Sequence, residues 1–351
     1  MKNDAIEKVF FSELNIKDTF FDSLRNDYFD FDGWFYKKGS NNEEAYVLRD
    51  KGNLLGFLYL KKETEKDDSI QPAFHEGKRL KIGTFKIDSH GTVLGQRFLS
   101  IILRKMLDED FEFTYVTVFS KQTRLISLLE KFGFRFWGYK NNEYVYWKNK
   151  EVINDIYADF PRINCVNDTK KYLLSIYPTF HTKLFPASRL NTERNHFVED
   201  LSFTNTCEKI YLCAMRGVDE MKMGDLVVIY RTAESGKSAE YSSVVTSICT
   251  VVETTNINRF SNFEAFLAYC GKGTVFTKTQ LMDFWNKKNY PIIVKLLYNV
   301  PLQKRIIRKK LIEDIGISRQ KYIGYMELTN EQFYKIIELG EINESFPEFI
   351  T

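Results

Sequence analysis

A short segment rich in small residues, residues 88–98 (DSHGTVLGQRF), follows a strand-like stretch and precedes a helix-like one. Small residues at such a junction let the backbone turn tightly and direct free N–H groups outward, where the following helix dipole reinforces them. Gly91 and Gly95 have no side chains that would keep phosphate groups at a distance, and Arg97 adds positive charge. The pattern is typical of an anion-binding loop. Two glycines four residues apart leave an ordinary strand-to-helix turn open as the alternative.

Alternating and periodic apolar residues predict the elements that must position this loop. An Asp/Gly/Asn turn at 50–53 joins the first two strands, and Gly133 ends the last helix. Residues 61–77 form a charged loop. The expected elements are, in order, strand 45–48, strand 54–60, a strand ending near 88, helix 94–107, strand 115–119, helix 121–132, strand 134–137 and strand 144–147.

On these residues the first half resembles the GNAT acetyltransferase superfamily. The family's acyl-CoA-binding motif reads Arg/Gln-x-x-Gly-x-Gly/Ala, with a Gly after its first residue. Here His90 takes the first position, Gly91 follows it, Val93 replaces the middle Gly and Gly95 matches the last position.

A second signature of the family, Asn-x-x-Ala-x-x-x-Tyr-x-x-x-Gly-Phe with a further Gly, is similar to residues 122–139. Gly133, Phe134 and Gly138 match it, whereas Gln122 stands for the Asn and Leu129 for the Tyr. In the family, that Tyr often protonates the departing thiolate.

The resemblance implies an α+β fold, a mixed GNAT-type sheet with flanking helices, and acetyl-CoA as the acyl donor. The strand before the loop and strand 115–119 splay apart, and the acyl-pantetheine chain lies in the gap. The residues that the resemblance places at the cofactor are Phe85, Ile87, His90, Gly91, Thr92, Val93, Leu94, Gly95, Gln96, Arg97 and Gln122.

The implied reaction is direct transfer of the acetyl group to an amine. A base removes the amine proton and a backbone N–H polarises the thioester carbonyl. Asp88 and Glu143 are the candidates for the base, and Asp88 lies closer to the expected cofactor.

Aromatic residues crowd the N-terminal segment, where the superfamily forms part of its acceptor pocket. They either cage a flat acceptor or form helix faces packed on the sheet. These residues are Phe11, Phe20, Phe21, Tyr28, Phe29, Phe31, Trp34 and Phe35.

The pattern of strand-like and helix-like segments changes near residue 150. We expect a GNAT-like domain at 1–148, a linker at 149–168 and a second domain at 169–351. The second half contains a Gly-Asp turn leading into a strand at 224–232. The other elements expected there are strands 242–252 and 292–298 and helices 263–269, 278–288, 307–315 and 330–339.

This half resembles the PUA-like group, which includes ASCH and EVE domains and has a small β-barrel with helices. Members of that group commonly bind RNA or modified bases, and some ASCH members hydrolyse an acetylated nucleobase. Binding of RNA needs a local cluster of cations, and the basic run at 304–310 is the candidate. The alternative is that this run is the solvated start of a helix. The candidate cations are Lys183, Lys304, Arg305, Arg308, Lys309 and Lys310.

Composition limits the remaining classes. The 351 residues are 44% hydrophobic and 28% charged with a net charge of +3, which indicates a globular protein without a bulk nucleic-acid signature. The five cysteines form no CxxC pair, and His181 and His196 are isolated, so the sequence predicts neither a disulfide framework nor a metal site. Without a signal peptide or a membrane-length apolar run, we expect a cytoplasmic location.

The leading hypothesis from the sequence is an acetyl-CoA-dependent N-acyltransferase whose second domain recruits the acceptor, such as an RNA or a ribonucleoprotein component. Its alternative is a non-catalytic acyl-CoA-binding or RNA-binding protein with a degenerate acetyltransferase fold. Val93, Gln122 and Leu129 favour that alternative, whereas Gly91 and Gly95 favour cofactor binding. Deacetylation by the second domain is a third hypothesis.

Overall fold

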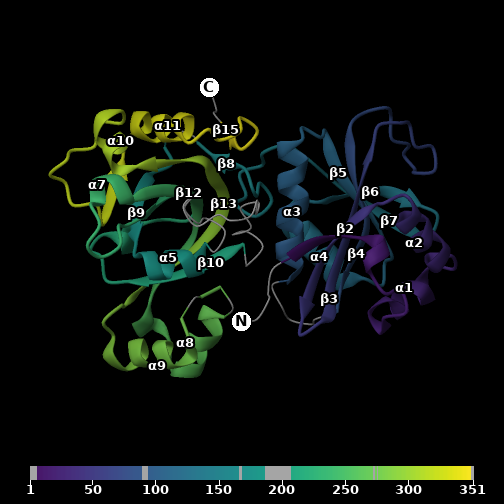
Figure 1. The fold of residues 1–351 in the computed structure, drawn as a ribbon, viewed down its shortest axis with the longest axis horizontal. Helices are drawn as coiled ribbons and strands as arrows, with labels where there is room; N and C mark the ends of the chain where they lie inside the picture. Colours follow the sequence, from purple (N-terminus) through teal and green to yellow (C-terminus); the bar gives the residue numbers. More distant parts are fainter. Residues whose placement is uncertain are drawn as a thin grey trace. The chain divides into compact units, whose positions relative to one another are not determined.

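Two compact units make up the chain, Met1–Glu151 and Val152–Thr351. The computed structural model describes residues 6–88, 94–165, 168–185, 207–271, 273–274 and 276–348. Both units combine a mixed sheet with helices (Figure 1), which confirms the predicted α+β class.

A seven-stranded sheet, in the order β1-β2-β3-β4-β5-β7-β6, forms the centre of the first unit. All neighbouring strands are antiparallel except β4 and β5, which are parallel. The predicted strands are present, and β1 is an edge strand that we did not predict. The strands are β1 (Ile6–Phe10), β2 (Glu44–Asp50), β3 (Asn53–Glu63), β4 (Arg79–Ile87), β5 (Phe113–Val118), β6 (Arg135–Lys140) and β7 (Glu143–Asn149).

Helices cover the two faces of this sheet differently. On one face lie α1 (Asp22–Asp27) and α2 (Phe31–Ser40), and the aromatic residues of α2 and of the segment before α1 pack on β2 and β3. On the other face lies α3 (Leu94–Asp108), next to α4 (Thr123–Lys131). The opposite placement follows from strand alternation, because Phe57 packs in the aromatic cluster whereas its neighbour Gly56 faces Phe98 of α3.

The connection between β3 and β4 is a packed structure rather than a solvated charged loop. Its Ile70 and Phe74 are buried against Tyr115 and Val145 of the sheet. Paired backbone hydrogen bonds join Gln71 to Tyr139 of β6. Residues 64–78 therefore cover the β5-β7-β6 half of the face on which α1 and α2 cover the other half.

The second unit contains a six-stranded sheet, in the order β10-β13-β12-β11-β9-β14. β9 and β11 are parallel, and register shifts at three places along the β12–β13 pair let these two long strands bend (Figure 1). Its strands are β9 (Lys171–Ile176), β10 (Glu208–Cys213), β11 (Leu226–Arg231), β12 (Val244–Asn256), β13 (Ile292–Ile307) and β14 (Tyr325–Leu328). A short parallel pair, β8 (Ile163–Asn164) and β15 (Pro347–Glu348), lies outside this sheet.

One helix boundary in this unit was predicted wrongly. The chain remains a strand through Ile307, so the basic run at 304–310 begins in β13 and only its last three residues belong to α10 (Arg308–Glu313). The buried residues Val300, Leu302 and Ile306 keep the two-residue period of a strand, and the charges between them obscured it.

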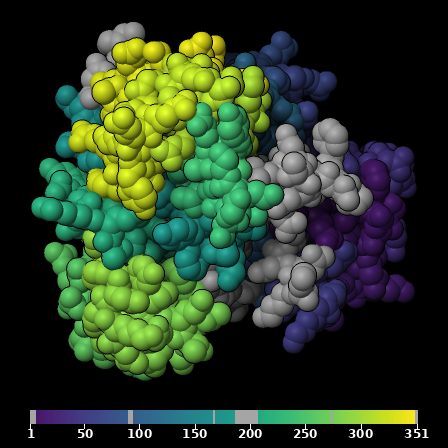
Figure 2. Space-filling view, turned by 60° about the vertical axis from the view of Figure 1, so that its left-hand side comes forward, coloured from purple at the N-terminus to yellow at the C-terminus, as the bar shows by residue number. Residues whose placement is uncertain are grey.

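The remaining helices of the second unit gather around the two ends of its sheet. In Figure 2, the light green segment that carries α8 and α9 forms a rounded lobe at one end of this unit. Its interior is aromatic and includes Phe263, Phe266, Phe276 and Phe284. The helices are α5 (Pro178–Leu184), α7 (Ala239–Ser242), α8 (Phe263–Cys270), α9 (Lys278–Lys287) and α11 (Asn330–Leu339).

Candidate functional site

The parallel pair β4–β5 is incomplete. The two strands pair over four positions, from Arg79 opposite Phe113 to Ile82 opposite Val116. β4 then continues for five residues to Ile87 along β3, and β5 continues to Val118 along β7. In the part of the chain that the structure describes, no strand pairs with the β5-facing edge of β4 beyond Ile82. The sheet therefore opens into a wedge at its centre, as the resemblance implies.

Backbone groups of β4 face this wedge in a defined pattern. The N–H of Asp88 donates to the carbonyl of Leu55 at 3.0 Å, so the backbone groups of Asp88 and Lys86 point toward β3. Successive residues of a strand direct these groups to opposite edges. The N–H and C=O groups of Phe85 and Ile87 therefore point toward the wedge, where an extended amide-containing chain could complete the ladder.

A β-bulge marks the point where the wedge begins. Opposite the consecutive residues Tyr59 and Leu60 of β3, the partners on β4 are Thr84 and Ile82, so Gly83 is the extra residue. A Cβ built on exposed Gly83 would lie 2.7 Å from the Tyr59 ring, which explains why glycine is suited to this position. A bulge redirects backbone N–H groups, and the sequence analysis did not single this one out.

Part of the predicted phosphate loop, namely His90, Gly91, Thr92 and Val93, lies outside the described residues. The helix that follows begins at Leu94, which is buried.

The remaining predicted phosphate-loop residues are described by the structure. A Cβ on Gly95 would meet the end of the Leu128 side chain of α4 at 2.4 Å, so α3 and α4 pack closely at this glycine. Arg97 is only 2% exposed, and Gln96 is partly buried. Arg97 therefore does not add its charge to the open surface.

The second GNAT-like signature forms α4 and the start of β6. Gln122 is the exposed N-terminal capping residue of α4, and its side chain makes no capping hydrogen bond. Leu129, which replaces the family's Tyr, is completely buried. Gly138 is required by close contact with the loop, because a Cβ there would lie 1.9 Å from the Gln71 carbonyl oxygen.

Of the two candidate bases, Glu143 is the one with the better defined side-chain contacts. The Tyr28 hydroxyl, which follows α1, donates to its carboxylate at 2.8 Å. Burial and then the Glu143 charge raise the pKa of the Tyr28 phenol, which keeps this donor protonated. The Tyr28 ring also lies 5.5 Å from that of Phe119, just beyond β5. Tyr28 and Glu143 thus meet at the open end of the wedge, although 115 residues separate them in the sequence.

Asp88, the other candidate base, is exposed at the end of β4. Burial lowers the pKa of Lys86, and the charge of Asp88 partly offsets this effect. The Lys86 amine donates to Ser23 of α1 at 2.5 Å. Helix α1 therefore contacts β4 through Ser23, and the Tyr28 that follows it contacts the end of β5, on either side of the wedge.

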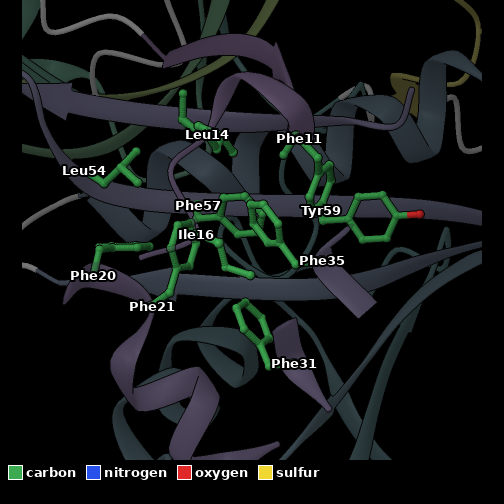
Figure 3. Packing of buried hydrophobic residues seen from close by; sticks show 12 residues of the cluster. Phe11, Leu14, Ile16, Phe20, Phe21, Phe31, Phe35, Leu54, Phe57 and Tyr59 are labelled. Carbon is green, nitrogen blue, oxygen red and sulfur yellow. The ribbon is translucent and has the colours of Figure 1, made fainter. Parts of the chain in front are cut away.

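Most of the N-terminal aromatic residues form a structural core. Figure 3 shows Phe11, Phe20, Phe21, Phe31 and Phe35 packed with Phe57 of β3, and all of them are at most 5% exposed. For these residues the alternative of helix faces packed on the sheet is confirmed.

Two aromatic residues of the same segment differ, since Tyr28 is 39% exposed and Phe29 is fully exposed. At the edge of the cluster, the Tyr59 hydroxyl points away from the other rings in Figure 3 and accepts a hydrogen bond from Lys38 at 2.7 Å.

The cations predicted to bind RNA do not form one free basic surface. Lys304 pairs with Glu341 at 2.9 Å, Lys310 with Asp314 at 3.5 Å and Lys309 with Glu313 at 3.9 Å. Arg305 and Arg308 donate to backbone carbonyls, and Lys183 is exposed on α5. The structure thus distributes the basic run between β13 and α10.

Histidine and cysteine residues of the second unit are structural where they are described. His181 is 1% exposed, with its Nε2 atom 2.9 Å from the Thr246 hydroxyl. All five cysteines are buried thiols, and burial raises the pKa of Cys165 to about 12. Among the described residues there is no group of three potential metal ligands and no helix that is long and apolar enough to cross a membrane.

Comparison with known proteins gives similarities of structure only. No protein-family model matches the sequence, and no curated protein matches it. The ASCH protein from Zymomonas mobilis is 13% identical with a TM-score of 0.32, covering 49% of this chain and 96% of that chain. The N-acetyltransferase PseH from Campylobacter jejuni, in complex with acetyl coenzyme A, is 15% identical with a TM-score of 0.30, covering 42% and 99%. A GNAT-family acetyltransferase from Listeria monocytogenes is 15% identical with a TM-score of 0.29 and the same coverage.

Proposed function

We propose that the first unit is an N-acyltransferase that moves the acetyl group of acetyl-CoA directly to an amine. The observation that carries this proposal is the wedge between β4 and β5, with the backbone groups of Phe85 and Ile87 at its edge. Acetyl-CoA supplies a thioester and a pantetheine arm that contains two amides. An extended chain of that kind fits an open strand edge, because each amide can replace a missing ladder hydrogen bond.

The residues around the wedge have separate roles in this proposal. The bulge at Gly83 turns backbone N–H groups toward the position of the thioester carbonyl, whose oxygen gains negative charge as the amine attacks. Glu143 accepts the proton that the amine loses as the new C–N bond forms and the C–S bond breaks. Tyr28 holds the Glu143 carboxylate at the open end of the wedge by its 2.8 Å hydrogen bond. The CoA thiolate leaves without the family's Tyr, since Leu129 is buried, and takes its proton from water.

A titration with acetyl-CoA, followed by thermal unfolding of the full chain, tests cofactor binding. Ligand binding to the native state should raise the melting temperature, and at 100 times Kd the stabilisation is about 2.7 kcal/mol. In the variant Thr117→Trp, a large side chain stands on β5 directly beyond the last paired residue, Val116. This variant should fold and lose the stabilisation by acetyl-CoA. An equal stabilisation of the variant and the native chain would place the cofactor elsewhere.

Release of free thiol from acetyl-CoA in the presence of amines then separates an enzyme from a binding protein. Turnover that depends on an amine supports the transferase. Stabilisation by acetyl-CoA without turnover for any amine would instead favour the non-catalytic acyl-CoA-binding alternative. Leu129 and Gln122, which replace the family's Tyr and Asn, favour that alternative. Recruitment of an RNA acceptor by the second unit remains a prediction from the sequence. It is tested by comparing how much RNA the native chain and the variant Lys183→Glu retain at low salt.

A further inference from the structure

A charged cluster lies beside the narrow end of the wedge, on the face that residues 64–78 cover. Its centre is Glu63 of β3, whose carboxylate accepts hydrogen bonds from Tyr115 at 2.6 Å and Lys61 at 2.8 Å and lies 3.5 Å from Arg79. A second carboxylate, Asp67 of the loop, pairs with Lys140 of β6 at 3.1 Å. Both carboxylates of the cluster therefore already have cationic partners.

Lys81 is the fourth cation of this cluster and has a different environment. It stands opposite Tyr115 in the ladder, one residue before the last pair of β4 and β5. Its ammonium lies 5.6 Å from the centre of the Tyr115 ring. Within the described ranges, no carboxylate lies within ion-pair distance of this ammonium, and no hydrogen bond is formed by it.

The local charge balance is positive. Four cationic groups, Lys61, Arg79, Lys81 and Lys140, surround two carboxylates, Glu63 and Asp67. Burial, and then the charge of Lys140, lowers the pKa of Lys81, and Lys61 acts in the same direction. The attraction of Glu63 and Asp67 only partly offsets these effects. A bound anion would compensate this excess of positive charge.

Lys81 is also close to the reacting centre proposed above. It precedes the bulge at Gly83 by two residues and lies on the same face of the sheet as Tyr115. Residues 64–78 close that face on the β5-β7-β6 side, with Ile70 and Phe74 fully or almost fully buried. Lys81 is itself half-buried there, so an anionic group at its ammonium would be partly shielded from water.

We infer that the acceptor is a small amine that also carries a carboxylate or phosphate group, and that Lys81 binds this anionic group beside the wedge. The inference rests on the proposed function, because it names the acceptor class of that same site. Lys81 acts here as a residue that determines specificity. The acceptor's amine extends from Lys81 toward Gly83 and the Tyr28–Glu143 pair.

The test compares pairs of probes that differ in the anionic group, namely phosphoethanolamine with ethanolamine and β-alanine with propylamine. We expect the kcat/KM for acetyl transfer to each anionic amine to exceed that of its neutral partner by roughly tenfold, as a desolvated charge-assisted contact provides. Lys81→Met should remove this preference without changing stabilisation by acetyl-CoA, and Lys81→Arg should restore part of it. Lys66→Met is the matched control, since Lys66 lies in the segment 64–78 next to the cluster but forms an exposed pair with Asp68.

Calorimetric titration of the probes without acetyl-CoA gives a second measurement that does not depend on turnover. Native chain should bind phosphoethanolamine more tightly than ethanolamine, and Lys81→Met should bind both equally. Equal binding of both probes to the native chain, or an unchanged preference in Lys81→Met, would overturn the inference while leaving the transferase proposal intact. If acetyl-CoA does not bind and phosphoethanolamine does, the anion site stands and the transferase proposal fails.

Discussion

Among the described residues, the main sheet of each unit contains one parallel strand pair, and one pair is complete whereas the other is not. In the second unit, β9 and β11 pair along their full length, from Lys171 opposite Leu226 to Ile176 opposite Arg231. In the first unit, β4 and β5 pair over four positions and then diverge. A complete ladder satisfies the backbone groups of both strands, whereas a divergent pair leaves one edge available. In the function proposed above, β9–β11 stabilises the fold and β4–β5 binds the ligand.

The surroundings of the two pairs support this distinction. All residues of β9 and β11 are buried, and β14 covers the other edge of β9. Along β4, burial ends at Ile82, and Gly83 is exposed. At the divergent pair, Lys81 lies at the paired end, and Tyr28 and Glu143 lie near the end of β5.

The largest expected effect is the opposite response of the two pairs to the same bulky substitution. Ser175→Trp inserts a ring into the complete pair at a position that is 8% exposed, opposite Tyr230. It should lower the free energy of unfolding by ~1–3 kcal/mol or more, because the site has no room. Thr117→Trp in the divergent pair should leave unfolding nearly unchanged and abolish stabilisation by acetyl-CoA. Denaturant unfolding with and without acetyl-CoA measures the free energy of unfolding of both variants. Equal losses of stability in the two variants would contradict the difference between the complete and the divergent pair.

Glu143→Gln should have the next largest effect, on rate rather than on stability. Removing the base is expected to lower kcat by about 10²-fold, in the range of general-base catalysis. The amide keeps the size of the side chain and can still accept from Tyr28. Tyr28→Phe serves as the comparison, and we expect a smaller loss because the carboxylate remains. If Asp88→Asn rather than Glu143→Gln abolishes turnover, the base is Asp88.

Gly83→Ala tests the bulge at the start of the wedge. The added methyl group meets the Tyr59 ring at 2.7 Å, so the backbone at the bulge has to shift. We expect kcat to fall by roughly tenfold, because misdirected N–H groups no longer stabilise the developing negative charge. Gly39→Ala is a matched control, since its nearest contact is an ordinary 3.6 Å. A full rate in Gly83→Ala would exclude the bulge from catalysis.

The smallest effect should come from Asp67→Asn, which weakens the attachment of residues 64–78. Burial opposes ionisation of Asp67, but hydrogen bonds from Ser69 and Lys140 outweigh it and lower the pKa to about 2. A carboxylate with a lowered pKa in the folded state stabilises the fold above its unfolded pKa of roughly 4, and this contribution disappears as the pH falls toward 2. The melting temperature of the native chain should therefore be about 2 °C above that of the variant at pH 6. The gap should close toward pH 2, and a gap independent of pH would show that the ionised carboxylate is not responsible.

Local patterns in the sequence predicted strands β2 to β7 of the first unit, because alternation and helical spacing depend on neighbouring residues. They also located α3 and α4 and the core position of most N-terminal aromatic residues. The same reasoning ended β13 too early, since Lys304 and Arg305 interrupt the apolar alternation that continues to Ile306.

The candidate site depended on contacts that no local pattern contains. Tyr28 and Glu143 are 115 positions apart, and Lys81 differs from its neighbouring lysines only because Glu63 and Asp67 already have other partners. The bulge at Gly83 arises from the register of β3 against β4. Gly95 also packs closely against Leu128, and its predicted role at the cofactor stays a prediction.

Hydrogen–deuterium exchange of the full chain with and without acetyl-CoA tests the central claim most directly. If the open edge of β4 binds the acyl-CoA arm, the amides of Phe85 and Ile87 should exchange more slowly when acetyl-CoA is bound, while those of β9 stay unchanged. Binding of acetyl-CoA with no added protection at residues 83–88 would contradict the account.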